Sequence, residues 1–124
     1  MIAVVDDEIC VCRAMERLFK SAGFDVVTFT GGAAFLQFVE TKKVDCAIVD
    51  LHMPQLSGID VQLKLAQSGK RVPVVIVTGQ DTTESQRRVM DAGAVAYLRK
   101  PADDRSLVEA VEKGISQYKT SGTT

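Results

Sequence analysis

The sequence lacks the features that would tie the chain to a membrane or to nucleic acid. Its formal net charge is −1, which gives no broad attraction to DNA because nonspecific binding needs many Lys and Arg contacts to phosphates. No apolar run approaches the roughly 20 residues that a bilayer-spanning helix needs, and the N-terminus does not resemble a signal peptide. We therefore expect a cytoplasmic protein that binds no membrane and, by itself, no DNA.

Cysteine and histidine are scarce. Three cysteines cannot all pair within one chain, and free cysteines commonly serve as small hydrophobic residues in a reducing compartment. Cys10 and Cys12 form a C-x-C pair, but no second cysteine pair exists, and the only histidine, His52, lies far along the chain. We expect neither disulfides nor a zinc site.

The chain does contain a regular series of apolar runs. Its 124 residues, 46% apolar and 25% charged, fit one globular domain. Five short runs rich in Val and Ile are almost unbroken by polar residues, which predicts parallel strands buried on both faces. These runs are residues 2–5, 26–29, 46–49, 72–77 and 94–98.

Helical patterns separate these runs. Residues 11–22 carry apolar side chains at three- and four-residue spacing before a stop at Gly23, and Gly93 ends the fourth pattern. The other predicted helices are residues 34–39, 59–66, 85–92 and 107–115. Fivefold strand–helix alternation predicts a doubly wound, flavodoxin-like α/β fold with a five-stranded parallel sheet in the order 2-1-3-4-5.

The last residues differ in composition from the rest of the chain. Residues 119–124 are Lys, Thr, Ser and Gly, a polar composition typical of a linker or tail. We therefore assign the domain to residues 1–118. The sequence leaves open whether a further domain follows.

Polar residues follow four of the five predicted strands, where ligands bind in open parallel sheets. The second strand, at the predicted edge, ends in Phe29-Thr30-Gly31-Gly32 and offers no acid or base. The other strand ends carry Asp6-Asp7-Glu8, Asp50, Thr78-Gly79 and Arg99-Lys100-Pro101.

Asp6, Asp7 and Asp50 should converge, because the first and third strands are neighbours in the predicted order. Two carboxylates about 4 Å apart repel by roughly 4 kcal/mol at an effective dielectric near 20, so a cation is needed. Mg²⁺ suits a site with few carboxylates because it keeps waters and shares a phosphate. Lys100 adds a second positive charge and Thr78 a hydroxyl.

This set of groups matches the needs of phosphoryl transfer, which are a nucleophilic oxygen, a bridging metal and a cation for the equatorial oxygens. Asp50 is the predicted nucleophile because it stands alone at the end of a central strand, whereas Asp6 and Asp7 are adjacent and better placed to hold the ion. Attack by Asp50 on a phosphorylated donor would give an acyl phosphate that water can hydrolyse.

From residue 1 to about residue 118 the sequence resembles response regulator receiver domains, and most closely the receivers that precede a LuxR-type helix-turn-helix output domain. No such output domain lies within these 124 residues. The resemblance to receivers rests on five short motifs in order: V-V-D-D-E from Val4, D-L-H-M-P from Asp50, S-G at Ser57, T-G at Thr78 and K-P at Lys100. The likeness to receivers that precede a LuxR-type domain rests on D-L-H-M-P, S-G-I-D-V-Q from Ser57 and V-T-G-Q-D from Val77.

The resemblance implies a role for each of these positions. Asp50 would be the phosphoacceptor for a sensor histidine kinase, and Asp7, Asp50 and the backbone carbonyl of His52 would bind Mg²⁺, with Asp6 acting through a metal-bound water. Thr78 and Tyr97 would form a switch pair that remodels the surface of the fourth helix, fifth strand and fifth helix, a surface that also offers a route to a homodimer.

The resemblance further implies a cis Lys100-Pro101 bond and a signalling domain rather than an enzyme, with only self-phosphorylation and slow autodephosphorylation. One departure is Ala102, where many relatives carry a bulky apolar residue.

Other interpretations of the same residues remain. Asp6-Asp7 could be only a helix N-cap, Tyr97 only a core residue, and His52 an exposed loop residue or a group that alters hydrolysis. A flavin or nucleotide binder would need a glycine-rich or hydroxyl-rich loop after the first strand, and an aspartyl phosphatase would need an acid in place of His52. A phosphorylation-independent interaction domain is the third alternative.

Overall fold

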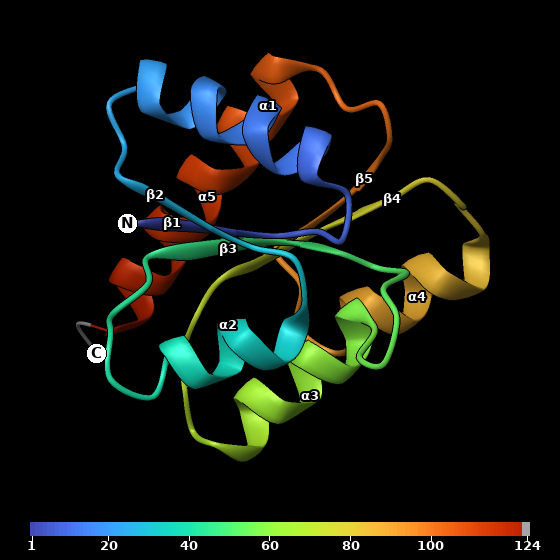
Figure 1. Ribbon diagram of the computed structural model, residues 1–124. Coiled ribbons are helices and arrows are strands. Elements are labelled where there is room, and N and C mark those ends of the chain that lie inside the picture. Colours follow the sequence, from blue (N-terminus) through green and yellow to red (C-terminus); the bar gives the residue numbers. More distant parts are fainter. Residues whose placement is uncertain (123–124) are drawn as a thin grey trace.

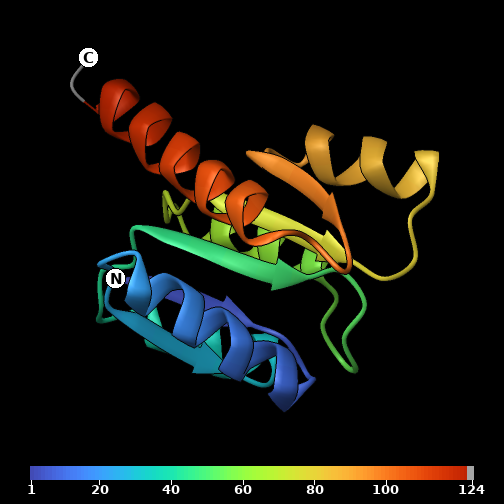
Figure 2. The same ribbon diagram turned by 90° about the horizontal axis from the view of Figure 1, so that it is seen from above.

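Five strands form one parallel sheet in the computed structural model, which describes residues 1–122. The strand order is β2-β1-β3-β4-β5, so the predicted order is confirmed. All strand arrows point the same way (Figure 2), as the parallel pairing requires. The strands are β1 (Ile2–Val5), β2 (Val26–Phe29), β3 (Cys46–Asp50), β4 (Val74–Thr78) and β5 (Ala96–Arg99).

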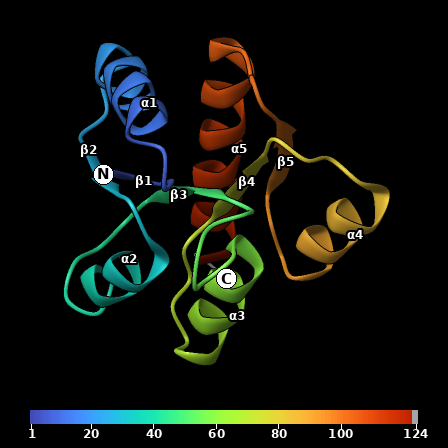
Figure 3. The same ribbon diagram turned by 45° about the vertical axis from the view of Figure 1, so that its right-hand side comes forward.

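Helices cover both faces of this sheet, as Figures 1 and 3 show. One face is covered by α1 (Ile9–Ser21) and α5 (Asp104–Gly122). The opposite face is covered by α2 (Gly32–Phe38), α3 (Gly58–Gln67) and α4 (Thr83–Asp91). The predicted doubly wound α/β class is therefore confirmed. None of the helices in residues 1–122 combines the length and apolar content that crossing a membrane requires.

The sheet separates two hydrophobic cores because successive side chains of a strand point to opposite faces. Ile48 of β3 faces α1 and α5 and packs with Phe19, whereas its neighbour Val49 faces the other helices and packs with Phe35. All of these side chains are fully buried or nearly so. Burial of Val and Ile on both faces is what keeps the central strands in register.

The edge strands differ from the prediction. β2 and β5 are only half-buried, with Arg99 exposed, so the expectation that every strand is covered on both faces is wrong for these two. β4 begins at Val74 because the preceding residue, Pro73, has no N–H to donate to the sheet. β5 begins at Ala96, after Ala94 donates to Val89 of α4 and Val95 donates to Val74 of β4.

The predicted glycine stops are confirmed at two helices. Gly23 and Gly93 follow α1 and α4 with φ of 94° and 99°, a left-handed conformation that glycine adopts without steric cost. The last helix is longer than predicted, since α5 runs to Gly122 through part of the expected tail. Its Tyr118 ring lies 5.4 Å from the guanidinium carbon of Arg71. Residues 123–124 of the predicted tail lie outside the described residues.

A buried glutamine joins α3 to the end of α4. Gln62 is 4% exposed, and its side-chain amide donates to the backbone carbonyl of Val89 at 3.0 Å. The same carbonyl accepts the N–H of Ala94 at 3.1 Å, and this bond closes the turn that contains Gly93 at the end of α4. Two donors therefore hold the C-terminal turn of α4 in place.

Candidate functional site

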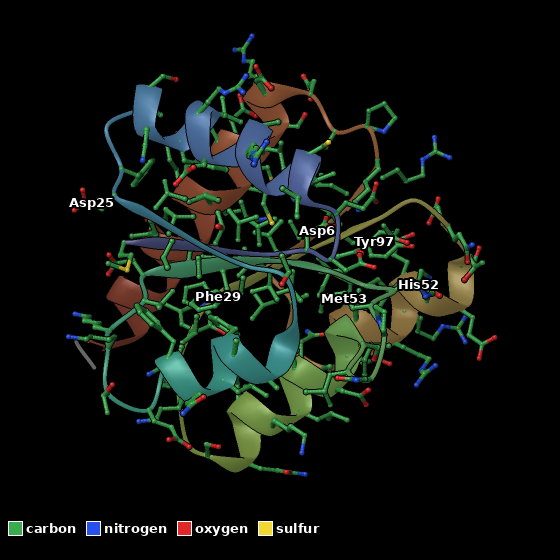
Figure 4. The ribbon with its side chains drawn as sticks, viewed as in Figure 1. Asp6, Asp25, Phe29, His52, Met53 and Tyr97 are labelled. Atoms are coloured by element: carbon green, nitrogen blue, oxygen red, sulfur yellow. The ribbon has the colours of Figure 1, made fainter. Side chains whose placement is uncertain are left out.

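The sheet places the polar residues predicted from the sequence at one edge. Asp6, His52 and Tyr97 are labelled at one end of the sheet in Figure 4, whereas Asp25 lies at the opposite end. Val5 pairs with Val49 between β1 and β3, so Asp6 and Asp50 are the next residues on neighbouring strands. Parallel strands thus deliver both carboxylates to one place.

Lys100, which follows β5, reaches across this edge to three carboxylates. Its Nζ atom lies 2.9 Å from Asp6 Oδ2 and 3.4 Å from Asp50 Oδ1. It also lies 3.3 Å from Glu8 Oε1, and this bond was not predicted from the sequence. Asp6 and Asp50 are almost fully buried, and Lys100 keeps 18% of its side chain exposed. The bond between Lys100 and Pro101 is cis, as the sequence resemblance implied.

Burial and charge act against each other on the Asp50 carboxyl group. Burial, and then repulsion by Asp6, raise its pKa from 3.8 to about 6, although Lys100 acts to lower it. Burial acts to lower the pKa of Lys100, but its hydrogen bond with Asp6 and the charges of Asp6 and Asp50 outweigh burial and raise it to about 12. At neutral pH, Lys100 is therefore a cation and most Asp50 groups are carboxylates.

Asp50 and Lys100 both line a solvent-accessible pocket. Its volume is about 290 Å³, and Asp7 and His52, both exposed, also line it. The structure therefore brings together Asp7, Asp50 and Lys100, as the sequence predicted, and Asp6 lies directly behind them in contact with Lys100. The remaining lining residues are Glu8, Gly79 and Gln80.

The acids at the end of β1 form a compact oxygen-rich cluster. One carboxylate oxygen each from Asp6, Asp7 and Glu8 lie within 4.8 Å of one another. The backbone N–H of Glu8 donates to Asp6 Oδ1 at 2.9 Å, which fixes the orientation of the buried carboxylate. Carboxylate oxygens grouped beside Asp50 are the donors that a small hard cation such as Mg²⁺ takes, so the residues fit the predicted ion.

The start of α3 packs against the backbone of Asp50 and Leu51. Ser57 and Asp60 form a reciprocal capping box, and the N–H of Gly58 donates to the carbonyl of Leu51 at 2.9 Å. A Cβ atom on Gly58 would lie 2.9 Å from the backbone oxygen of Asp50, closer than a side chain can come. Sequence reasoning assigned Gly58 only to a motif, because a close approach between residues of different elements leaves no local signal.

Thr78 lies at the end of β4, fully buried, and its hydroxyl is engaged locally. It accepts the N–H of Gln80 at 3.0 Å and donates to the carbonyl of Gln80 at 3.1 Å. The sequence predicted a hydroxyl at this edge but not these two bonds. In this arrangement the hydroxyl of Thr78 serves the turn after β4.

Tyr97 of β5 packs against the core on the side of α4. Its hydroxyl is buried and makes no hydrogen bond of ordinary geometry within the described residues, although the carboxylate of Asp81 is close enough to affect it. Burial, and then Asp81, raise the pKa of Tyr97, so the ring stays neutral. Tyr97 is therefore a half-buried residue that packs against the core, and it does not line the acidic pocket.

The strand order and the acidic pocket with its lysine define the class of protein as a doubly wound α/β domain with one charged site at the carboxyl ends of its strands. Residues 2–112 match the family model of the response regulator receiver domain. The chain belongs to this family, the receiver domains of two-component response regulators.

Individual relatives agree with this assignment. The chain is 35% identical over 111 residues to nodulation protein W of Bradyrhizobium diazoefficiens, with 90% of this chain and 49% of that protein covered. It is 32% identical over 116 residues to the transcriptional regulatory protein FixJ of the same organism, with 94% and 57% covered. The chain thus spans about half the length of the curated relatives it matches.

A solved structure matches the whole domain. The crystal structure of a response regulator receiver domain protein from Clostridium thermocellum superposes with a TM-score of 0.89 at 30% identity. The match covers 96% of each chain. The similarity therefore extends over the complete sheet and its helices.

Proposed function

We propose that Asp50 accepts a phosphoryl group from a sensor histidine kinase and that this modification controls an output domain or partner, as in transcription regulation. The observation that carries the proposal is the contact of Lys100 with both Asp6 and Asp50 beside the open pocket. The Lys100 ammonium lies between two buried carboxylates, so it is placed to pair with an oxygen of a phosphoryl group on Asp50 as well.

The bonds that form and break in the proposed reaction belong to Asp50, the phosphorylated donor and, later, water. A carboxylate oxygen of Asp50 forms a bond to phosphorus while the bond from phosphorus to the donor breaks, and the product is an acyl phosphate. Water later cleaves this bond and releases inorganic phosphate, so Asp50 is regenerated. Because the pKa of Asp50 is about 6, the nucleophilic carboxylate is the main form at pH 7.

The residues around Asp50 have separate roles in this proposal. Asp6, Asp7, Asp50 and the backbone carbonyl of His52 would hold Mg²⁺, directly or through water. When bound, the ion supplies positive charge for the carboxylates and the incoming phosphoryl oxygens. Lys100 pairs with a phosphoryl oxygen as well as with Asp6, because its ammonium already lies between the two acids.

The proposed switch joins Thr78 to the surface of α4, β5 and α5. To donate to a phosphoryl oxygen, the Thr78 hydroxyl must give up the bond that it donates to the carbonyl of Gln80, which loosens the turn before α4. The Tyr97 hydroxyl makes no hydrogen bond of ordinary geometry in the described residues, so inward movement of this ring would give up only its weaker interaction with Asp81. A homodimer through this surface would be one way to read out the change.

The domain would act in the cytoplasm as a phosphorylated signalling protein rather than as an enzyme with a separate substrate. Self-phosphorylation from a donor and slow autodephosphorylation are the only reactions we assign to it. No direct binding of DNA by residues 1–122 is proposed, because the charge of the chain gives no broad attraction to it.

A phosphorylation assay with intact-mass detection tests this function. With acetyl phosphate and Mg²⁺, the wild type should gain one phosphoryl group and Asp50→Asn should gain none. Asp25→Asn, at the opposite end of the sheet, is the matched control and should be labelled like the wild type. Labelling retained in Asp50→Asn, or an unmodified wild type that also fails to bind beryllium fluoride, would refute the proposal.

A further inference from the structure

The amino-terminal end of the sheet carries a second hollow, of about 340 Å³, which we call the basic hollow. The connection from α2 to β3 contributes Lys42 and Lys43 to it, and the connection from α3 to β4 contributes Lys70 and Arg71. In Figure 1 both connections lie at the left, whereas the carboxyl ends of the strands lie at the right. The basic hollow therefore lies at the opposite end of the strands from Asp50.

Positive charge in the basic hollow is not balanced by the protein. Among the described residues that line it, Glu40 is the only carboxylate, against four basic side chains. Within the described residues, none of these four forms an ion pair, whereas Lys20 and Arg105 pair with acids four residues away. The neighbouring acid, Asp45, is already bound by the N-terminal ammonium at 2.6 Å.

The basic side chains stand on an ordered backbone. The N–H of Lys42 donates to the carbonyl of Phe38 at 3.0 Å, and the N–H of Lys70 donates to Leu65 at 3.0 Å. Between them, Val44 is buried in the core. The guanidinium of Arg71 lies over the Tyr118 ring, which restricts its orientation. The backbone that carries Lys42 and Lys70 is therefore fixed, while their side chains remain exposed to solvent.

We propose that the basic hollow binds a small phosphate-rich anion of the pyrophosphate or nucleoside polyphosphate class. Like-charged groups that surround one concavity concentrate a positive potential, which attracts multivalent anions most strongly. A volume of about 340 Å³ falls within the range of small-ligand sites. The lysine ammonium groups can act as point charges for the phosphate oxygens, and Arg71, at the side of the hollow, adds to the positive potential.

Nucleic acid fits the basic hollow less well than a small anion does. A nucleic-acid backbone is bound by a groove or row of cations that continues along the surface. Here the four cations meet around one depression, and the whole chain has a net charge of −1. The proposal is therefore limited to a compact ligand with two or more phosphate groups.

An NMR titration with inorganic pyrophosphate tests this site. The Asp50→Asn variant in EDTA is used, so that neither phosphorylation nor a metal at the acidic pocket contributes. We expect saturable shifts of the amide signals of residues 39–44 and 70–72, weakening as ionic strength rises because the Debye length is about 10 Å at 0.1 M salt. Sulfate at equal ionic strength should bind at least about fivefold more weakly, because it carries less charge.

Charge-removal variants separate a specific site from general attraction. Lys42→Gln with Lys70→Gln should weaken pyrophosphate binding about tenfold, whereas the matched double variant Arg13→Gln with Lys113→Gln, on the far side of the sheet, should change it less than about twofold. Equal weakening by both pairs, or shifts spread over all exposed lysines, would overturn the site. Tighter binding of a single-stranded oligonucleotide at the same residues would overturn the assignment to a small anion.

Discussion

The ammonium of Lys100 lies closer to Asp6 than to Asp50, at 2.9 Å against 3.4 Å. Asp6 is fully buried and directly follows β1, whereas Asp50 is the last residue of β3 and lines the open pocket. Lys100 is therefore anchored by one acid while it remains within reach of the other. This relationship means that loss of Lys100 affects two buried carboxylates at once.

Lys100→Met should leave Asp6 and Asp50 without their shared cation. We expect the pKa of Asp50 to rise above about 6, because Lys100 acts to lower it in the wild type. The free energy of unfolding at pH 7 should fall by about 3–5 kcal/mol, the usual cost of removing one partner of a buried ion pair. Carbon-13 NMR titration and urea unfolding measure these changes.

Lys20→Met is the control for that variant because Lys20 pairs with Glu16 on the surface at 3.4 Å with 59% of its side chain exposed. Exposed pairs contribute about 0–1 kcal/mol, so this variant should lose less stability. Equal losses in the two variants would show that Lys100 is not specially placed.

Stability should depend on the ionisation of Asp50. The folded pKa of about 6 is above the ordinary value of 3.8, so ionisation destabilises the folded state. This cost is complete above pH 6 and disappears as the pH falls below 4. Asp50→Asn, measured in EDTA, should therefore raise the free energy of unfolding at pH 7.5 by about 2 kcal/mol, with a much smaller gain at pH 4.5.

The control for the pH experiment is Asp25→Asn, an exposed acid at the far end of the sheet. It should show no comparable gain at either pH. A gain in Asp50→Asn that stays the same from pH 4.5 to 7.5 would contradict the raised pKa.

Mg²⁺ should stabilise the folded wild type through the acids at the end of β1. An ion at ten times its dissociation constant adds about 1.4 kcal/mol to the free energy of unfolding if it binds only the folded state. Asp7→Asn should lose most of this increase because Asp7 lines the pocket and belongs to the acidic cluster. Thermal unfolding with Mg²⁺ and with EDTA gives the comparison, and an undiminished increase in Asp7→Asn would remove Asp7 from the site.

Gly58→Ala should disturb Asp50 without touching its side chain. The added Cβ would lie 2.9 Å from the Asp50 carbonyl and 3.1 Å from Leu51 Cα, two backbone atoms that cannot move independently of β3. We expect a loss of about 1–3 kcal/mol in stability and slower phosphorylation by acetyl phosphate. Gly79→Ala, where a Cβ meets nothing within 4 Å, is the matched control for stability. Equal stability of the two variants would show that β3 yields at this contact.

The strands and their order could be predicted from the sequence because the apolar runs are short, rich in Val and Ile, and separated by helical spacing. The predicted strand order places Asp6 beside Asp50, as the structure does. The half-exposed edges β2 and β5 could not be distinguished from the centre, since edge and central strands carry similar apolar residues here.

What the sequence could not predict depends on contacts between distant elements. The bond from Lys100 to Glu8 spans 92 residues, and the approach of Gly58 to Asp50 depends on where α3 begins. The two bonds of the Thr78 hydroxyl with Gln80 depend on a turn conformation that several sequences can adopt. The length of α5 was underestimated because its last residues are polar and carry no apolar spacing.

The double acceptor at Val89 has a mechanical consequence for α4. Gln62 and Ala94 both donate to this carbonyl, and the bond from Gln62 of α3 is the one that sliding of the helix along its axis would break. A tilt about that end would break neither, and it would carry the first turn, next to Thr82 and the connection from Thr78, through the longest arc. The C-terminal end of α4, which α3 holds, is therefore remote from the acids, whereas the N-terminal end, which a tilt would move most, lies on their side of the sheet.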